Sequence, residues 1–157
     1  MIRPATPADV PTILRFVRDL AAFEREPDAV EATEAMLHEA LFGAHPAAEA
    51  VIAEKGEPLG FALFFHNFST WTGRRGLYLE DLYVTPAARG RGVGAALLRH
   101  LARLAVERDC ARFEWSVLDW NVDAVNFYRA LGAVGMDEWT VQRVSGDALR
   151  KLAKERG

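Results

Sequence analysis

The chain has 157 residues, of which 50% are hydrophobic and 26% are charged, and its formal net charge is −3. This length predicts a single domain over residues 1–157, and the composition is typical of globular rather than disordered proteins. We expect no membrane association, because no apolar run reaches the ~18 residues of a membrane span, and the first ten residues lack the apolar stretch of a secretory signal. We also expect no nucleic-acid partner, because such partners favour a strongly basic surface.

The cysteine and histidine content argues against a disulfide framework and against a metal site. Cys110 is the single cysteine, so an internal disulfide framework is excluded, and we expect a cytoplasmic protein. It has no evident histidine partner in the sequence, and we do not expect it to act as a nucleophile. The four histidines have no metal-ligand spacing, so we predict no metal site.

Apolar periodicity and turn residues predict alternating strands and helices. Thr6, Pro7 and Asp9 form a helix-start pattern, and Thr33 begins a second helix that ends at Gly43. The predicted strands are 1–6, 49–55, 59–68, 77–84, 112–118 and 139–144. The other predicted helices follow the glycine-rich segment at 93–105, begin at Asn121, and occupy 146–156. This order predicts an α/β domain with a mixed sheet.

The segment 87–98, AARGRGVGAALL, places three glycines between a predicted strand and a predicted helix. Such a loop offers free backbone N–H groups to an anion, and the helix dipole and two arginines add positive charge. A phosphate-binding P-loop is excluded, because the required Lys-Ser/Thr pair is missing. A solvated turn is the simplest alternative, but the position between a strand and a well-patterned helix favours a bound ligand.

A dinucleotide-binding loop is the second ligand class that the glycines could fit. Gly90, Gly92 and Ala95 match its glycine pattern, and Asp109 follows at a suitable distance. That pattern belongs after the first strand of a β-α-β series, however, whereas several predicted strands precede it here. The diphosphate of coenzyme A is the third candidate and the one we favour.

These residues resemble the GNAT superfamily of acetyl-CoA-dependent N-acetyltransferases. Arg89, Gly92 and Gly94 fit the superfamily pattern R/Q-x-x-G-x-G/A. The similarity covers nearly the whole chain and is closest to the diamine (spermidine/spermine) and thialysine acetyltransferase branch. The stretches that carry it are IRPATPAD, GAHP, LYLEDLYV, RGRGVG and DWNVDAVNFYRALGA. The resemblance implies the GNAT fold, a mixed and mostly antiparallel sheet flanked by helices.

The resemblance also implies which residues bind acetyl-CoA. The backbone of 82–84 would pair with the pantetheine arm like an added strand. The loop would bind the diphosphate through its N–H groups, and the start of the helix after Asn121 would also contact the coenzyme. The implied coenzyme-binding residues are Leu82, Tyr83, Val84, Arg89, Gly90, Arg91, Gly92, Val93, Gly94, Ala95, Asn121, Asp123 and Ala124.

Two kinds of side chain are expected to carry the chemistry. An alkyl ammonium has a pKa near ~10.4 and must lose a proton before it can attack a thioester. Glu80 and Asp81 are candidates to hold that cation and to receive its proton, directly or through water. The alternative is that they are structural charges at an opening of the sheet. Tyr128 matches the family tyrosine that protonates the leaving sulfur, whereas for Phe127 we expect core packing.

Neighbouring side chains on a regular strand point to opposite faces, so Glu80 and Asp81 could not both serve one site. The resemblance implies a β-bulge in this strand, and we predict it near Glu80. The looser part of the resemblance adds further acceptor-site positions, and it implies that Glu138 and Trp71 each help to close the tunnel. Trp115 is equally consistent with core packing. The acceptor-site residues are Phe23, Glu24, Glu80, Asp81, Glu114, Trp115, Ser116 and Glu138.

The sequence therefore predicts an enzyme that acetylates a primary amine of a small polyamine- or lysine-like acceptor by direct attack in a ternary complex. Phe23 stands where the diamine enzymes have tyrosine, so the diamine contact at this position differs. The alternative function is a non-catalytic acyl-CoA-binding module. By resemblance alone we also expect a homodimer with acceptor sites near the subunit boundary.

Overall fold

The computed structural model of the chain describes residues 1–156. Its elements form two compact units, Met1–Leu118 and Asp119–Gly157. The strands are β1 (Ile2–Pro4), β2 (Glu49–Lys55), β3 (Glu57–Ser69), β4 (Arg74–Val84) and β5 (Phe113–Trp115). The α-helices are α1 (Val10–Phe23), α2 (Glu34–Phe42), α3 (Val93–Glu107), α4 (Val122–Ala130) and α5 (Gly146–Lys154). The 3-10 turns are η1 (Pro7–Asp9) and η2 (Pro86–Ala88).

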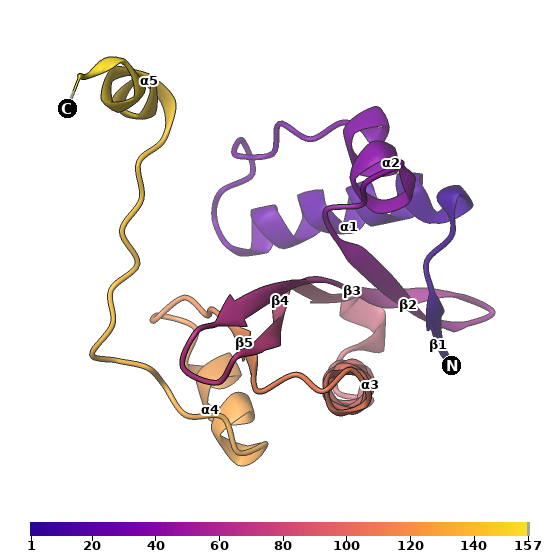
Figure 1. Cartoon of the computed structure of the whole chain (residues 1–157). Coiled ribbons are helices and arrows are strands. Elements are labelled where there is room, and N and C mark those ends of the chain that lie inside the picture. The colour runs from indigo at the N-terminus through magenta and orange to yellow at the C-terminus, as the bar shows by residue number, and fades with distance from the viewer. Residues whose placement is uncertain (157) are drawn as a thin grey trace. The chain divides into compact units, whose positions relative to one another are not determined.

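All five strands belong to one sheet in the first unit, and they lie in the order of the sequence. The first three pairings are antiparallel, and β4 pairs with β5 in parallel. Helices α1 and α2 cover one face of this sheet and α3 covers the other (Figure 1). The mixed, mostly antiparallel sheet with helices on both faces confirms the predicted fold class.

Two apolar layers hold the first unit together. On the α1 face, Ile13 and Phe16 of α1 pack with Ile52, Phe61 and Tyr83 of the sheet. On the opposite face, alternate strand residues meet the apolar stripe of α3, whose buried residues are Leu97, Leu98, Leu101 and Ala105. Because both faces are covered, the central strands are apolar on both sides, as the run from Phe61 to Phe64 illustrates.

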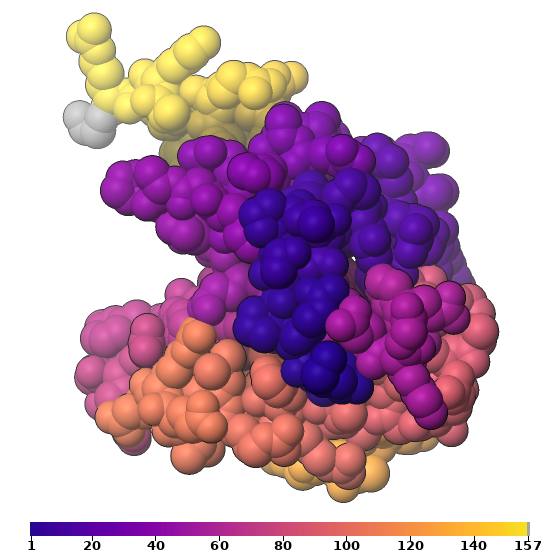
Figure 2. Space-filling view, turned by 90° about the vertical axis from the view of Figure 1, so that its right-hand side faces the viewer, coloured from indigo at the N-terminus to yellow at the C-terminus, as the bar shows by residue number. Residues whose placement is uncertain are grey.

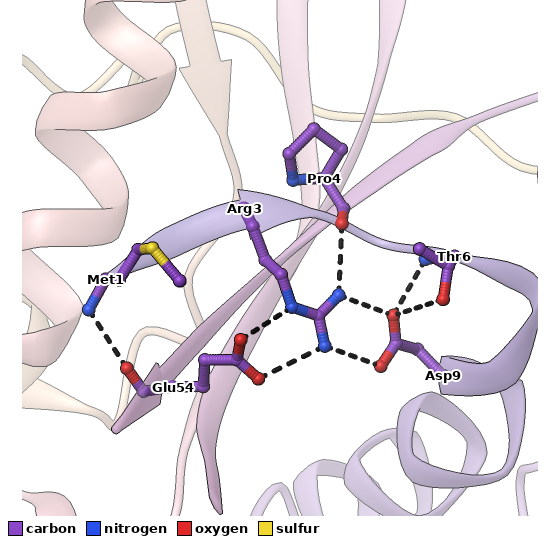
Figure 3. Close-up of polar contacts among 6 residues, drawn as sticks. All are labelled: Met1, Arg3, Pro4, Thr6, Asp9 and Glu54. Carbon is purple, nitrogen blue, oxygen red and sulfur yellow. Dashed lines mark hydrogen bonds and ion pairs between the residues drawn. The ribbon is translucent and has the colours of Figure 1, made fainter. Parts of the chain in front are cut away.

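A network of charged side chains centred on Arg3, the Arg3 network, joins edge strand β1 to the rest of the first unit (Figure 3). The Arg3 guanidinium donates to both carboxylate oxygens of Asp9, at 2.8 and 2.9 Å, and its Nε donates to Glu54 Oε1 at 2.8 Å. The Asp9 carboxylate also accepts from the Thr6 backbone N–H at 2.7 Å. Figure 2 shows the N-terminal residues at the surface of the unit, as expected for a strand at the sheet edge.

Most predicted boundaries agree with the structure. The Thr33 hydroxyl accepts from the Met36 N–H at 3.2 Å and starts α2, and the helix begun by the Thr6 pattern opens with the turn η1. Strand β5 is shorter than the predicted segment 112–118, and β4 begins three residues before the predicted strand. None of the helices in residues 1–156 is both long and apolar enough to cross a membrane.

The predicted strand at 139–144 is wrong. In the part of the chain that the structure describes, this segment belongs to no strand. Trp139 and Val141 are 72% and 80% exposed, so their apolar side chains are not buried against another layer. The β-propensity of such residues depends on packing against neighbours, and where that packing is missing it does not produce a strand.

Candidate active site

The predicted β-bulge lies at Glu80. In the β3–β4 ladder Phe64 pairs with Leu79 and the adjacent Leu63 pairs with Asp81, so Glu80 is an extra residue with no partner on β3. Residues directly opposite each other share a face of the sheet. Asp81 therefore lies on the α1 face with Leu63, whereas Leu79 lies on the α3 face with Phe64.

The bulge gathers carboxylates at the end of α1. Glu24 follows the last residue of α1, and its charge and that of Glu80 both act on Asp81. Burial is the main cause that raises the pKa of Asp81 to about 6, and the negative charges of Glu80 and Glu24 raise it further. Burial also raises the pKa of Glu24. A cluster of partly desolvated carboxylates is suited to bind a cation and to accept a proton from it.

The pairing of β4 with β5 ends at Leu79, directly before the carboxylates Glu80 and Asp81. Among the described residues, β5 pairs with β4 only through Leu77, Tyr78 and Leu79. In the described part of the chain, β4 from Asp81 to Val84 pairs with β3 on one side and has no strand on the other. The Thr85 N–H donates to Leu59 O on β3 at 2.9 Å, so by strand alternation the Leu82 and Val84 peptide groups face the open edge. An extended ligand can pair with the Leu82 groups and the Val84 N–H, whereas the Val84 carbonyl already accepts from Arg89 Nε.

The glycine-rich loop continues from this open edge into α3. Gly90 and Gly92 have φ values of 74° and 80°, a region that favours glycine, and Gly92 is the N-cap of α3. The Ala96 N–H donates to Gly92 O at 3.0 Å, so the N–H groups of 93–95 precede the first helical hydrogen bond. This arrangement fits a diphosphate, because free N–H groups and the positive end of the helix dipole both point to an anion.

Other residues predicted at the acceptor site lie farther along β5. Glu114 accepts from Arg112 Nε at 2.8 Å and from Asn67 Nδ2 at 3.3 Å, and Ser116 Oγ lies 2.9 Å from the Tyr78 hydroxyl. Arg112 and Tyr78 are not among the residues that the sequence predicts for the site. Arg112 and Glu114 are two residues apart on a strand, so their opposite charges on one face could have predicted the pair.

Trp115 lies on the other face of the sheet. It pairs with Leu79, which faces α3, and its ring centroid is 4.9 Å from that of Phe113. The structure therefore separates Trp115 from the carboxylate cluster, and this placement matches the packing alternative. Phe23, by contrast, is the last residue of α1 and directly precedes Glu24.

The remaining predicted residues belong to the second unit. Asn121 is the N-cap of α4, and its side-chain oxygen accepts from the Ala124 N–H at 3.3 Å, as the sequence predicts. Asp123 lies in the first turn of α4 and is exposed. Tyr128 is half-buried, with its ring centroid 5.6 Å from that of Phe127. Glu138 is exposed in the stretch between α4 and α5.

The chain is similar to curated enzymes over nearly its whole length. A thialysine N-epsilon-acetyltransferase of Sus scrofa is 39% identical, and the match covers 98% of this chain and 96% of the relative. An L-ornithine N5-acetyltransferase of Arabidopsis thaliana is 32% identical, over 98% of this chain and 87% of the relative.

A solved structure and a family model also match the chain over most of its length. An integron cassette protein from the mobile metagenome of V. cholerae superimposes with a TM-score of 0.82 at 29% identity, covering 99% of this chain and 98% of that one. Residues 14–133 match the model of the acetyltransferase (GNAT) family, and this range includes both the glycine loop and Tyr128. The chain belongs to the GNAT family of N-acetyltransferases, enzymes that use acetyl-CoA.

Proposed function

We propose that this enzyme transfers the acetyl group of acetyl-CoA to a primary amine of a small polyamine- or lysine-like acceptor, by direct attack in a ternary complex. The observation that carries the proposal is the carboxylate cluster of Glu24, Glu80 and Asp81 beside the open edge of β4. A site with three carboxylates favours an acceptor that carries more than one positive charge. The relatives named for thialysine and ornithine support this class of acceptor.

The chain's own groups would hold the coenzyme at two places. The Leu82 peptide groups and the Val84 N–H would pair with an extended arm along β4, and the N–H groups of the loop from Gly90 to Ala95 would bind the diphosphate. When bound, acetyl-CoA supplies an activated acetyl thioester. Asn121, Asp123 and Ala124, at the start of α4, would add the further coenzyme contacts that the family pattern implies.

The carboxylates would prepare the amine for attack. The acceptor arrives as an ammonium ion, which Glu24 and Asp81 would hold by charge. At neutral pH Asp81 is mostly ionised, because its pKa of about 6 lies below 7. It is therefore available, together with Glu80, to take the ammonium proton directly or through water.

Tyr128 would donate a proton to the leaving thiolate of coenzyme A. A thiolate leaves as the new amide forms, and a phenol can donate a proton to it. The Tyr128→Phe variant should bind coenzyme A like the wild type but turn over about 10²-fold more slowly. Phe127→Leu is the control for packing in the same helix turn. Wild-type turnover in Tyr128→Phe would contradict the assignment.

We also infer that both units act as one catalytic domain, because the family match at 14–133 crosses their boundary at Leu118. A cytoplasmic homodimer remains our expectation from the resemblance. Light scattering of the purified protein tests the dimer.

Thiol release from acetyl-CoA tests the function directly. The panel should contain spermidine, thialysine and ornithine, with butylamine as a control that carries one charge. We expect one or more of the multiply charged amines to give a kcat/KM at least tenfold above that of butylamine. Coenzyme A binding without turnover of any amine would instead favour a non-catalytic binding module.

A further inference from the structure

The side chain of Arg89 turns back from the glycine loop onto the preceding strand and onto α1. Its Nε donates to Val84 O at 3.0 Å. Its guanidinium carbon lies 5.4 Å from the ring centroid of Phe23 and 5.7 Å from that of Tyr83. Both distances are within the range of cation–π interactions. Arg89 therefore contacts the end of β4 and the end of α1 at the same time.

The two rings belong to different parts of the first unit. Tyr83 is only 6% exposed, and its ring centroid lies 5.3 Å from that of Phe16 in the core. Phe23 is 46% exposed and directly precedes Glu24. The guanidinium thus connects the coenzyme loop to a fixed point in the core and to the segment that presents an acceptor-site carboxylate.

The hydrogen bond to Val84 also limits which backbone groups a ligand can use. The Val84 carbonyl faces the open edge of β4, since the adjacent Thr85 N–H donates to β3. Arg89 occupies this acceptor. An extended arm along the edge can pair with the Leu82 peptide groups but meets an occupied carbonyl at Val84, where the chain turns toward the loop.

We propose that Arg89 is a positioning residue that fixes the coenzyme loop against the end of α1, so that the affinity for coenzyme A depends on Phe23. The inference rests on the proposed function, because it takes the loop as the coenzyme site. It requires a guanidinium, which can stack on two rings while its Nε donates to a carbonyl. A lysine ammonium is a point charge without that planar geometry.

The test is the dissociation constant of coenzyme A, measured by titration calorimetry without any amine. We expect Arg89→Lys and Arg89→Gln to weaken binding by a similar factor of about ten, because glutamine loses the cation and a single lysine ammonium cannot keep the Val84 hydrogen bond and both ring contacts at once. Phe23→Leu should weaken coenzyme binding by about threefold. Phe23→Tyr keeps the ring and should retain wild-type affinity. Phe68→Leu, an exposed phenylalanine on β3, is the matched control and should change nothing.

A double-variant cycle tests whether Phe23 affects coenzyme A binding through Arg89. The Phe23→Leu/Arg89→Gln variant should bind coenzyme A no more weakly than Arg89→Gln alone, because the Phe23 contact needs the guanidinium. Fully additive effects would overturn the proposal. If the Arg89 variants do not fold, as judged by circular dichroism, the comparison of Phe23→Leu with Phe23→Tyr carries the test alone.

Two other results would overturn the proposal. If Arg89→Lys binds coenzyme A like the wild type while Arg89→Gln does not, the side chain acts only as a charge near the diphosphate. If Phe23→Leu changes the KM of the amine but not the dissociation constant of coenzyme A, Phe23 is only a wall of the acceptor site. Failure of the wild-type protein to bind coenzyme A would instead overturn the proposed function.

Discussion

Asp81 lies opposite Leu63 in the β3–β4 ladder, and the two side chains share the face of the sheet that packs against α1. In a regular strand Asp81 would share a face with Leu79, two residues earlier, which packs toward α3. The bulge therefore changes the buried face of β4 in the middle of the strand. It leaves Leu77 and Leu79 in one apolar layer, Tyr83 in the other, and a carboxylate at the transition.

The activity should depend on the ionisation of Asp81. Burial and the charges of Glu80 and Glu24 raise the pKa of Asp81 to about 6, so the carboxylate that holds the ammonium is lost as the pH falls below that value. We expect kcat/KM for a multiply charged amine to fall by about tenfold per pH unit below pH 6. Asp81→Asn should have a lower kcat/KM at pH 8 and should lack this inflection.

A pH series from 4.5 to 9 with acetyl-CoA at saturation provides the measurement. Asp109→Asn is the matched control, because Asp109 is exposed and paired with Arg74 at the other end of β4. This variant should keep the wild-type inflection. An unchanged inflection in Asp81→Asn would mean that another group controls the acid limb.

The same carboxylate should reduce stability at neutral pH. The pKa of Asp81 is about 6 in the folded protein, above the unfolded value of ~3.9, so the folded state binds more protons between these values. The contribution of Asp81 to the free energy of unfolding must then fall as the pH rises from about 4 to 6, and it stays low above pH 6. Asp81→Asn should be more stable than the wild type by about 2 kcal/mol at pH 8 and equal to it at pH 3.5. Denaturant titrations at both pH values check this, and a less stable variant at pH 8 would contradict it.

Deletion of Glu80 separates the role of the bulge from the role of the carboxylate. Leu79 and Asp81 already pair with consecutive residues of β3, so the deletion should leave the ladder and both apolar layers in place. It removes the local bend that a bulge introduces, at the point where the β4–β5 pairing ends. We therefore expect the deletion to weaken coenzyme A binding by at least tenfold, whereas Glu80→Ala, which keeps the extra residue, should bind like the wild type.

Titration calorimetry with coenzyme A, together with thermal melting of each variant, decides between these possibilities. Equal affinities in the deletion and in Glu80→Ala would show that the bend is not needed for the coenzyme edge. A melting temperature in the deletion close to that of Glu80→Ala is the control for an intact core.

Much of the fold could be predicted because local chemistry and tertiary structure agree. Thr33 and Asn121 accept backbone hydrogen bonds at helix starts, as their side chains predict. The resemblance to the family added the bulge at Glu80, which strand periodicity alone would not give. The clustering of Glu24 with Asp81 also follows from the family pattern, since these residues are 57 positions apart and no local rule joins them.

What the sequence could not predict is which residues pack against each other, because that depends on tertiary structure. Segment 139–144 has the composition of a strand, but its apolar side chains are exposed. Trp115 and Glu114 are neighbours on β5, so strand alternation fixes that they face opposite ways, yet only the pairing with Leu79 shows which face each one takes. The contact of Arg89 with Phe23 needs the path of the loop back over α1.

Gly60 should be essential for the stability of the β3–β4 ladder. A Cβ at this position would lie far inside the van der Waals contact distance of the Tyr83 carbonyl oxygen, which is backbone and cannot move freely. We expect Gly60→Ala to lower the free energy of unfolding by about 3 kcal/mol. In Gly94→Ala the new methyl group meets only Val84 Cγ2 at 3.8 Å, an ordinary contact, so that variant should be at least as stable as the wild type. A denaturant titration in which both variants lose the same stability would contradict this explanation.

The Arg3 network should protect the protein in mild acid (Figure 3). Hydrogen bonds from Arg3 are the main cause that lowers the pKa of Asp9 to about 2, below the unfolded value of ~3.9. The contribution of the Arg3–Asp9 pair to stability is therefore complete above about pH 4 and is lost as the pH falls toward 2. We expect Arg3→Gln to lower the free energy of unfolding by about 2 kcal/mol at pH 7, because it leaves the buried Asp9 carboxylate without its charged donor.

The exposed pair of Arg74 and Asp109, at 3.2 Å, provides the matched control for this prediction. Arg74→Gln should change the free energy of unfolding by less than about 0.5 kcal/mol, since exposed ion pairs contribute little. At pH 2.5 the difference between Arg3→Gln and the wild type should shrink to well under half of its value at pH 7, because Asp9 is then largely protonated in the unfolded chain and partly protonated in the folded one. A difference that stays constant from pH 7 to pH 2.5 would mean that Arg3 stabilises the edge strand by packing rather than through the carboxylate.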